Sequence, residues 1–167
     1  LDQGGLFISG AAPNRFEPDA GGKSWKYRLV GRDENPLYIK QTDIRAVQLA
    51  KAALYAGAKL LAESLNCEAF DEILLAGAFG THLDPKYVSE IGIIPDAPPE
   101  IIRSIGNAAG MGAALAVLNR AERAKIIEAV KHIEKMETAL EPKFQDYFVG
   151  AMKFPTAPAP SEDNNQR

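Results

Sequence analysis

The sequence predicts an α/β protein in which a mixed sheet is flanked by helices. A short apolar run at residues 73–75 suits a buried strand, and the small residues at 77–80 suit a tight turn after it. A long helical pattern precedes this run, and a second glycine turn at residues 106–107 leads into another helix. Strand, glycine turn and helix in this order let α/β proteins present backbone N–H groups to a phosphate or a nucleoside. Two alternatives stay open: the apolar run is a buried helical turn, or the glycines serve the turn alone.

The composition fits one well-packed domain. The 167 residues are 46% hydrophobic and 25% charged, which is enough for a single core. We expect this domain to occupy residues 1–155. Residues 156–167 are rich in proline and polar side chains and cannot offset the entropy lost on ordering, so we expect a disordered tail. The sequence does not begin with Met, and we expect it to be a fragment of a longer polypeptide.

Charge, cysteine content and hydropathy argue against several functions. The net charge of −3 is unlike that of a nucleic-acid-binding domain. Cys67 is the only cysteine, which excludes an internal disulfide and a multi-cysteine zinc or iron–sulfur site made by this chain alone. No apolar run approaches the roughly 20 residues of a membrane span. We therefore expect a cytoplasmic protein that binds neither nucleic acid nor membranes and has no metal site of its own.

Short strands are expected before the long helix. The candidates are residues 6–8, 25–30 and 37–40, which are separated by loops rich in glycine and proline. Apolar and basic residues alternate along 25–30, which is the period of a half-buried strand. We predict that this strand lies at a sheet edge.

The long helix is predicted from Asp43 to Leu65, with Thr42 or Asp43 as its cap. Its apolar positions recur at three- and four-residue steps and share a stripe with Lys51: Ile44, Val47, Leu54, Ala58, Leu61 and Leu65. Lys51 either snorkels to the edge of this stripe or meets an anion, and Gln48 lies on the same side. A second stripe of small residues would let a backbone or a flat ligand approach: Ala46, Ala50, Ala53 and Gly57. Close helix packing is the simpler explanation.

Helices are also predicted after both turns. Asp84 and Pro85 suit the N-cap and first position of a helix that ends near residue 92. The prolines that precede residues 100–104 favour a helical turn there. The helix after residues 106–107 carries almost no side-chain bulk, which suits either a ligand cleft or a close backbone crossing.

The C-terminal third is predicted to cover the core. A charged helix at residues 121–140 has one apolar side, made of Ile126, Ile127, Val130 and Ile133. An aromatic cluster follows it and is predicted to pack back onto the domain: Phe144, Tyr147, Phe148, Met152 and Phe154.

The order of these parts resembles the second half of the nucleotide fold shared by actin, the sugar and acetate kinases and the heat-shock chaperone ATPases, the ASKHA superfamily. More specifically, several segments are similar to the C-terminal domain of the ATP-dependent reductive activators of corrinoid proteins. These segments come in the family's order and cover roughly residues 36–155. They are residues 38–45, 48–53, 75–80, 83–85, 91–96, 106–108 and 148–155.

The resemblance implies an RNase H-like subdomain that forms the second half of an actin-like ATPase fold. In the superfamily the strand and its glycine turn contribute to the adenosine site, and in the chaperones a lysine-bearing helix lines the adenine pocket. The resemblance implies ATP and Mg²⁺ as cofactors, and we expect both glycine turns on one cleft. The implied cofactor-binding residues are Gln48, Lys51, Gly77, Ala78, Phe79, Gly80, Gly106 and Asn107. We predict that Lys51 contacts the nucleotide.

The resemblance also implies a function. The chain would be the nucleotide-binding C-terminal part of an activator that uses ATP to return a corrinoid protein of a methyl-transfer system from cobalt(II) to cobalt(I). The family's two-iron, two-sulfur cluster belongs to an N-terminal domain, and its acidic phosphate-handling motif belongs to the first half of the fold. Neither is present here, so no catalytic residue is assigned and this chain alone is expected to be inactive. The expected partners are the corrinoid protein and the N-terminal part of the same polypeptide, and a homodimer is left open.

One departure and two alternatives accompany this hypothesis. Many relatives have two glycines where this chain has Gly77 and Ala78, and the added methyl group could narrow the approach to a nucleotide. One alternative is a non-catalytic docking or dimerisation module, in which the glycines serve packing. The other is a small-molecule kinase of the same fold. ATP binding by the full-length protein would weaken the first, and corrinoid reduction without a phosphorylated product would exclude the second.

Overall fold

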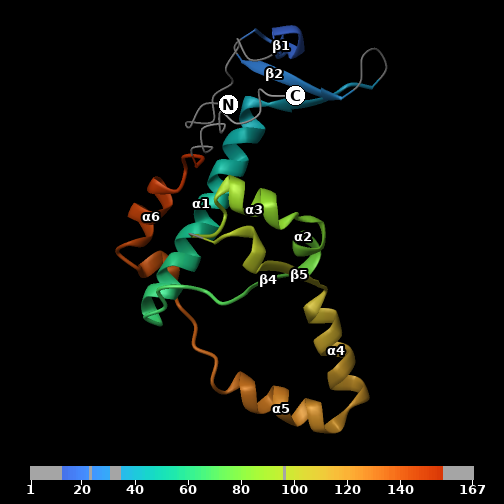
Figure 1. Ribbon diagram of the computed structural model, residues 1–167, viewed down its shortest axis with the longest axis vertical. Helices are drawn as coiled ribbons and strands as arrows, with labels where there is room; N and C mark the ends of the chain where they lie inside the picture. The colour runs from blue at the N-terminus through green and yellow to red at the C-terminus, as the bar shows by residue number, and fades with distance from the viewer. Residues whose placement is uncertain (1–12, 23, 31–34, 96, 156–167) are drawn as a thin grey trace, which may run out of the picture.

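A computed structural model describes residues 13–22, 24–30, 35–95 and 97–155 (Figure 1). The strands are β1 (Phe16–Pro18), β2 (Trp25–Val30), β3 (Leu37–Lys40), β4 (Ile73–Ala76) and β5 (Ile102–Gly106). The α-helices are α1 (Gln41–Ser64), α2 (Gly77–His82), α3 (Pro85–Ile91), α4 (Ala108–Leu118), α5 (Arg120–Val130) and α6 (Phe144–Gly150). Three short 3₁₀ helices are η2 (Pro13–Arg15), η3 (Pro99–Ile101) and η4 (Thr138–Leu140). The predicted strand at residues 6–8 and the predicted tail at 156–167 lie outside the described residues.

The first sheet is antiparallel and has the strand order β1-β2-β3. Residues 25–30 and 37–40 form strands, as predicted, but β2 lies in the middle of this sheet and not at its edge. The Glu17 carboxylate on β1 accepts a hydrogen bond from the Tyr38 hydroxyl on β3 and forms ion pairs with Lys26 and Arg28 on β2. The Glu17 carboxylate therefore links β1 to both of the other strands.

The second sheet consists of β4 and β5, which pair in parallel. Residues 73–75 form a strand, as predicted, but the strand is not buried in the described chain, since Leu74 is 47% exposed. The helical turn predicted at 100–104 is wrong because β5 occupies most of that range. Ile102 pairs with Ile73 and is only 4% exposed, so tertiary pairing and burial decide its conformation. Parallel and antiparallel pairing both occur, as expected, but in two separate sheets of the described chain: the β1-β2-β3 sheet is antiparallel and the β4-β5 sheet is parallel.

The small core lies between α3 and the parallel sheet. Val88 of α3 and Ile102 of β5 are buried together with Ala97, and neighbouring isoleucines and Leu75 pack against them. Asp84 caps α3 as predicted, because its Oδ1 atom accepts a hydrogen bond from the N–H of Lys86 at 2.9 Å. The cap fixes where the chain turns back toward the sheet.

Helix α1 buries only part of the predicted stripe, including Ile44 and Lys51. Val47, Leu54 and Leu61 of the predicted stripe are 42%, 60% and 52% exposed. The buried face consists of Ile44, Gln48, Lys51, Ala52, Ala56, Leu60 and Ala62. The N-cap is Lys40, whose N–H donates to the carboxylate of Asp43, so the predicted cap is also wrong. Helix α6 packs along α1, and this contact selects the buried face.

Helices α4 and α5 extend from β5 as an arm, away from the three-stranded sheet (Figure 1). No residue of α4 is buried, and Val117 and Leu118 are 75% and 84% exposed. The predicted helix at 121–140 is shorter than expected and ends at Val130. Its apolar side does not cover the core of the described chain, because Ile127 and Val130 are 57% and 58% exposed.

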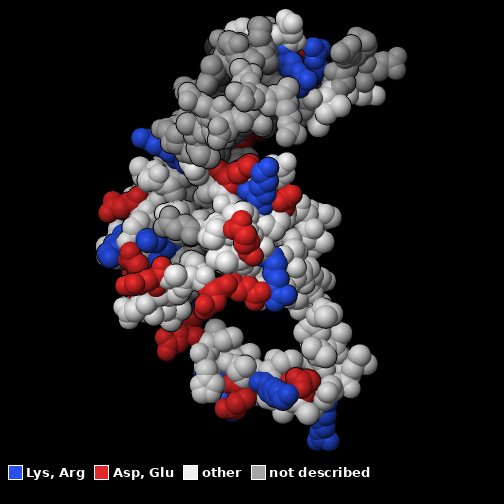
Figure 2. Space-filling view, in the orientation of Figure 1, with Lys and Arg blue, Asp and Glu red and all other residues white. Residues whose placement is uncertain are grey.

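The face shown in Figure 2 carries intermingled charges. Acidic side chains gather beside the loop between α1 and β4, with Lys and Arg side chains around them. On this face the described residues form no continuous basic surface of the kind that binds nucleic acid. None of the described helices combines the length and the apolar character needed to cross a membrane.

Candidate functional site

The two glycine turns lie side by side where β4 and β5 end, at the carboxyl end of the parallel sheet. This end, with residues 77–80 and 106–107, is hereafter called the glycine-turn edge. Ala76, the last residue of β4, pairs with Gly106, the last residue of β5. Because the strands are parallel, both chains leave the sheet at the same end. Gly77 begins α2 directly, and Asn107 precedes α4. Both turns therefore leave the sheet at the same end, as a shared cleft would require, and the predicted cleft itself stays a prediction.

Both turn glycines adopt a backbone conformation that other residues rarely adopt. The φ angle is +89° at Gly77 and +65° at Gly106. Apart from the adjoining backbone, no heavy atom of the described residues lies within 4 Å of the position that a Cβ atom would occupy at either residue. The glycines are thus required by the turn, and they also leave open space in front of the backbone.

Gly80 has a different role from Gly77, although both belong to the predicted site. A Cβ atom at Gly80 would lie 2.5 Å from the carbonyl oxygen of Leu75. The missing side chain therefore lets α2 pack closely against β4. Ala78 and Phe79 lie within α2, so the chain continues from the strand into a short helix rather than the predicted tight turn.

Asn107 fixes the start of α4. Its Oδ1 atom accepts a hydrogen bond from the N–H of Gly110 at 2.9 Å. A Cβ atom at Gly110 would lie 2.5 Å from Nδ2 of Asn107, so a larger residue there would displace the cap. The first N–H groups of an α-helix have no partner within the helix, and α4 presents them beside Gly106. This end of α4 can accept an anionic or polar ligand group.

Gln48 and Lys51 lie elsewhere, on the buried face of α1, and each is 3% exposed. Lys51 Nζ donates hydrogen bonds to the carbonyl oxygens of Ala151 at 2.6 Å and Lys153 at 2.7 Å. Gln48 Nε2 donates to the carbonyl oxygen of Met152 at 2.9 Å. These two side chains therefore bind the backbone of residues 151–153. Residues 151–155 are hereafter called the C-terminal segment.

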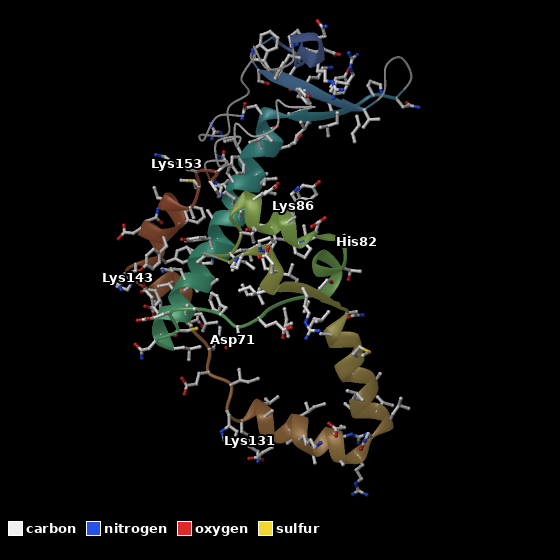
Figure 3. All side chains as sticks on the ribbon, viewed as in Figure 1. Asp71, His82, Lys86, Lys131, Lys143 and Lys153 are labelled. Carbon is white, nitrogen blue, oxygen red and sulfur yellow. The ribbon has the colours of Figure 1, made fainter. Side chains whose placement is uncertain are left out.

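The predicted site residues consequently fall into two groups. Figure 3 shows Lys153 of the C-terminal segment and His82 of α2 on opposite sides of the molecule. The glycine turns and Asn107 share the sheet edge, whereas Gln48 and Lys51 face the C-terminal segment. In the described chain, Lys51 donates its hydrogen bonds to carbonyl groups of its own polypeptide.

A cavity of about 410 Å³ lies beside Lys51. Its lining combines one face of α1 with α6 and the C-terminal segment: Lys51, Tyr55, Gly92, Asp146, Tyr147, Gly150, Ala151, Lys153, Phe154 and Pro155. Sequence reasoning did not identify Gly92 as a residue of this cavity. Gly92 is the C-cap of α3 and has a φ angle of +73°. The glycine at the end of a predicted helix was the available signal, because glycine is enriched after helix ends.

Comparisons with known proteins agree on one family. The sequence model for the C-terminal domain of RACo, described as the ASKHA domain, matches residues 1–164. The corrinoid activation enzyme RamQ of Eubacterium limosum is 40% identical over 158 residues, which cover 87% of this chain and 26% of RamQ. A solved structure of a reductive activator for corrinoid, iron–sulfur protein superposes with a TM-score of 0.82 at 27% identity. That match covers 93% of this chain and 25% of the solved chain. The chain thus spans about a quarter of the length of the relatives that it matches.

Proposed function

Because the chain belongs to the family of the RACo C-terminal domain, which has the actin-like ASKHA fold, we propose that it is the nucleotide-binding C-terminal part of a corrinoid activator. The complete protein would use ATP to favour the reduction of a bound corrinoid protein from cobalt(II) to cobalt(I), with the one electron supplied by the reduced two-iron, two-sulfur cluster expected in its N-terminal part, which is oxidised in the same step. The similarity to RamQ and to the solved reductive activator supports this proposal. The corrinoid protein is then the partner, and the remaining polypeptide supplies the parts that this chain lacks.

The observation that carries the proposal is the meeting of two open glycine turns at one sheet edge. Ala76 pairs with Gly106, and the space in front of Gly77 and Gly106 is free of other atoms of the described chain. Backbone N–H groups at such an edge can bind a nucleoside or a phosphate without interference from a side chain. We propose that residues 77–80 and 106–107 form one wall of the ATP site.

The other cofactors expected from the family require residues beyond this chain. The described residues contain no group of three or more His, Cys, Asp or Glu side chains placed to bind a metal ion. We propose that bound ATP and another part of the polypeptide provide the ligands of Mg²⁺. A single cysteine cannot hold a two-iron, two-sulfur cluster, so the cluster would belong to an N-terminal domain.

The predicted contacts of Gln48 and Lys51 with the nucleotide remain a separate prediction. Their donors point to carbonyl groups of the C-terminal segment, so we place the proposed site at the two turns alone. When ATP binds there, its binding and hydrolysis would stabilise the conformation of the complex that permits electron transfer. The contribution of this chain is to orient the nucleotide through the turn backbones and the start of α4.

A pair of matched glycine variants tests the proposal in the full-length polypeptide. Gly106→Ala places a methyl group in the open space of the site, at a φ of +65°, whereas Gly22→Ala does so in the β1–β2 turn at +67°. Each change costs about 1 kcal/mol through backbone strain. Only Gly106→Ala should also weaken ATP binding, about tenfold or more, as measured by calorimetry. Equal ATP affinity in both variants would contradict the proposed site.

One observation also supports the docking alternative. The arm of α4 and α5 exposes a large apolar surface, which includes Leu118 and Val130 at 84% and 58% exposure. Such a surface suits contact with another polypeptide. ATP-dependent formation of cobalt(I), followed by absorbance, separates the two functions, because a docking module alone would not respond to ATP. A phosphorylated small molecule among the products would indicate a kinase.

A further inference from the structure

Lys51 is a buried cation that depends on the C-terminal segment. Burial lowers its pKa, and no charged group of the described chain contributes to offset that effect. Its hydrogen bonds go to two carbonyl oxygens, and the ring centroid of Phe154 lies 5.3 Å from Nζ. An ammonium group without such partners would be costly to bury. Carbonyl dipoles and an aromatic face therefore replace the counter-ion that a buried lysine usually needs.

The carbonyl groups depend equally on α1. The oxygens of Ala151, Met152 and Lys153 are three successive acceptors, and Gln48 and Lys51 satisfy all three. Ala151 is also the C-cap of α6, where the last carbonyls of a helix lack partners within the helix. A lysine at this position is favoured by the negative end of the helix dipole. The two side chains thus hold the end of α6 and the residues after it.

The C-terminal segment also contacts the end of α3. A Cβ atom at Gly92 would lie 2.8 Å from Cγ of Pro155 and 3.9 Å from Nζ of Lys51. Gly92 is therefore the point at which α3, α1 and the C-terminal segment meet. Any side chain at this position would collide with Pro155.

Helix α3 connects this meeting point to the first glycine turn. It begins at Pro85, three residues after the end of α2, and α2 begins at Gly77. Its Val88 side chain is 1% exposed and packs in the core with Ile102 of β5. Helix α3 is consequently held by two contacts. The C-terminal segment packs against its end at Gly92, and the parallel sheet packs against Val88.

We propose that the C-terminal segment is a strap that fastens α3 to α1, and that Lys51 and Gln48 are the positioning residues that hold it. Its release would loosen the end of α3 and, through α2, the turn at Gly77. The link to ATP affinity rests on the proposed function, whereas the fastening itself rests on the contacts described above. Binding of ATP would in turn tighten the strap, because coupling between two sites is reciprocal.

Hydrogen exchange measured by mass spectrometry tests the fastening in the full-length polypeptide without nucleotide. Lys51→Met keeps the apolar stem and removes the donors. Loss of hydrogen bonds to a charged donor should raise exchange about ten- to hundredfold in peptides that contain residues 151–154 and 89–93. Lys59→Met is the control, because Lys59 lies on the same helix and interacts with Glu63 rather than with the C-terminal segment. Unchanged exchange in folded Lys51→Met would overturn the proposal.

A second variant reaches the strap from the opposite side and leaves Lys51 intact. Gly92→Ala should displace Pro155 and raise exchange in the same two regions. Gly22→Ala controls for strain, since its φ of +67° is close to the +73° of Gly92 and its surroundings are open. If hydrogen exchange at residues 151–154 is the same in Gly92→Ala and Gly22→Ala, the contact between Gly92 and Pro155 does not hold the C-terminal segment in place.

ATP affinity then separates this proposal from a direct contact of Lys51 with nucleotide. A strap predicts that Lys51→Met and Gly92→Ala both weaken ATP binding, by about fivefold or more. A direct contact predicts weaker binding in Lys51→Met alone, with unchanged exchange at the C-terminal segment, and that result would overturn the strap. If the wild-type polypeptide binds no ATP, the proposed function fails, while the exchange results still decide whether the segment is fastened.

Discussion

Two regions of this molecule carry the sequence features that suggested a ligand, and they use those features in opposite ways. At the glycine-turn edge, the space in front of Gly77 and Gly106 contains no other part of the described chain. At the C-terminal segment, Lys51 and Gln48 are almost fully buried and their donors bind carbonyl groups of the same polypeptide. In the first region the backbone next to the two glycines is accessible to a ligand. In the second region the side-chain donors of Lys51 and Gln48 bind carbonyl groups of the same chain.

The difference shows how a polar residue in an apolar helix should be assessed. A lysine in such a stripe has three outcomes: it reaches solvent, it meets a ligand, or it satisfies buried backbone groups of its own chain. Buried carbonyls need donors as strictly as a ligand does. The third outcome is the one seen for Lys51, and it becomes visible only when the distant acceptor segment is known.

The largest expected effect concerns Gly80, which lies near the open turn but is itself closely packed. In Gly80→Ala the new methyl group would meet the backbone of Leu75 at 2.5 Å, so the full-length protein should lose about 2–3 kcal/mol of unfolding free energy. Denaturant titration measures this loss.

Gly57→Ala is a suitable control for the Gly80 prediction. Gly57 lies within α1, and outside the backbone of that helix no heavy atom of the described residues is within 4 Å of its Cβ position. Alanine should therefore stabilise the helix by about 0.5–1 kcal/mol. If Gly80→Ala is as stable as the wild type, Gly80 is not closely packed against Leu75. The difference between Gly80 and the open glycines at 77 and 106 would then fail.

Local patterns predicted the parts of the fold that local physics decides. The strand at residues 73–75, the cap at Asp84 and the helix after Asn107 follow from apolar runs and capping chemistry. These features require no knowledge of distant segments. The shared position of the two glycine turns was instead implied by the resemblance to the family, because the sequence predicted a helical turn where β5 lies.

Long-range contacts decided the features that the sequence did not predict. Helix α1 has apolar residues on more than one face, and Ile44 is buried while Leu54 is 60% exposed. The choice depends on α6 and the C-terminal segment, about a hundred residues later in the chain. Residues 102–106 became a strand because Ile102 pairs with Ile73. The nucleotide contacts themselves remain predictions, since the comparisons identify the family and not the ligand atoms.

A smaller effect is expected for the cap of α4. Asn107→Ala removes the acceptor of the Gly110 N–H and should lower stability by about 1 kcal/mol. Asn119→Ala is a matched control, because Asn119 caps α5 through the N–H groups of Ala121 and Glu122. Thermal unfolding of the full-length variants should show similar losses.

The two cap variants should differ in ATP affinity. The cap of α4 borders the proposed site, so only Asn107→Ala should weaken ATP binding. If both variants bind ATP equally well, the start of α4 does not take part in the site, and the open region is limited to the turn at Gly77.

The smallest expected effect is a difference in acid sensitivity between two contacts of α6, one with Glu63 and one with Lys51. At one end Glu63 of α1 accepts hydrogen bonds from the hydroxyl of Tyr147 and from Nζ of Lys143. The hydrogen bond from Tyr147, followed by that from Lys143, lowers the pKa of Glu63 below its usual value. A lowered pKa in the folded state means that this contact contributes above the unfolded pKa, about 4.3, and is lost as the pH falls through the folded pKa. The carbonyl groups held by Lys51 should respond much less, because lysine stays protonated on acidification.

Hydrogen exchange at pH 7 and at a series of lower pH values, down to the lowest at which the protein stays folded, tests this difference. Acidification should increase exchange of residues 144–150 in the wild type relative to Glu63→Gln at the same pH, a comparison that cancels the intrinsic pH dependence of exchange. Glu63→Gln should show the looser state already at pH 7. Because the carboxylate is exposed and screened by solvent, the change should be small and should decrease further in high salt. A larger acid response at residues 151–154 than at 144–150 would show that the buried lysine contact, and not the exposed carboxylate, is the acid-sensitive end of α6.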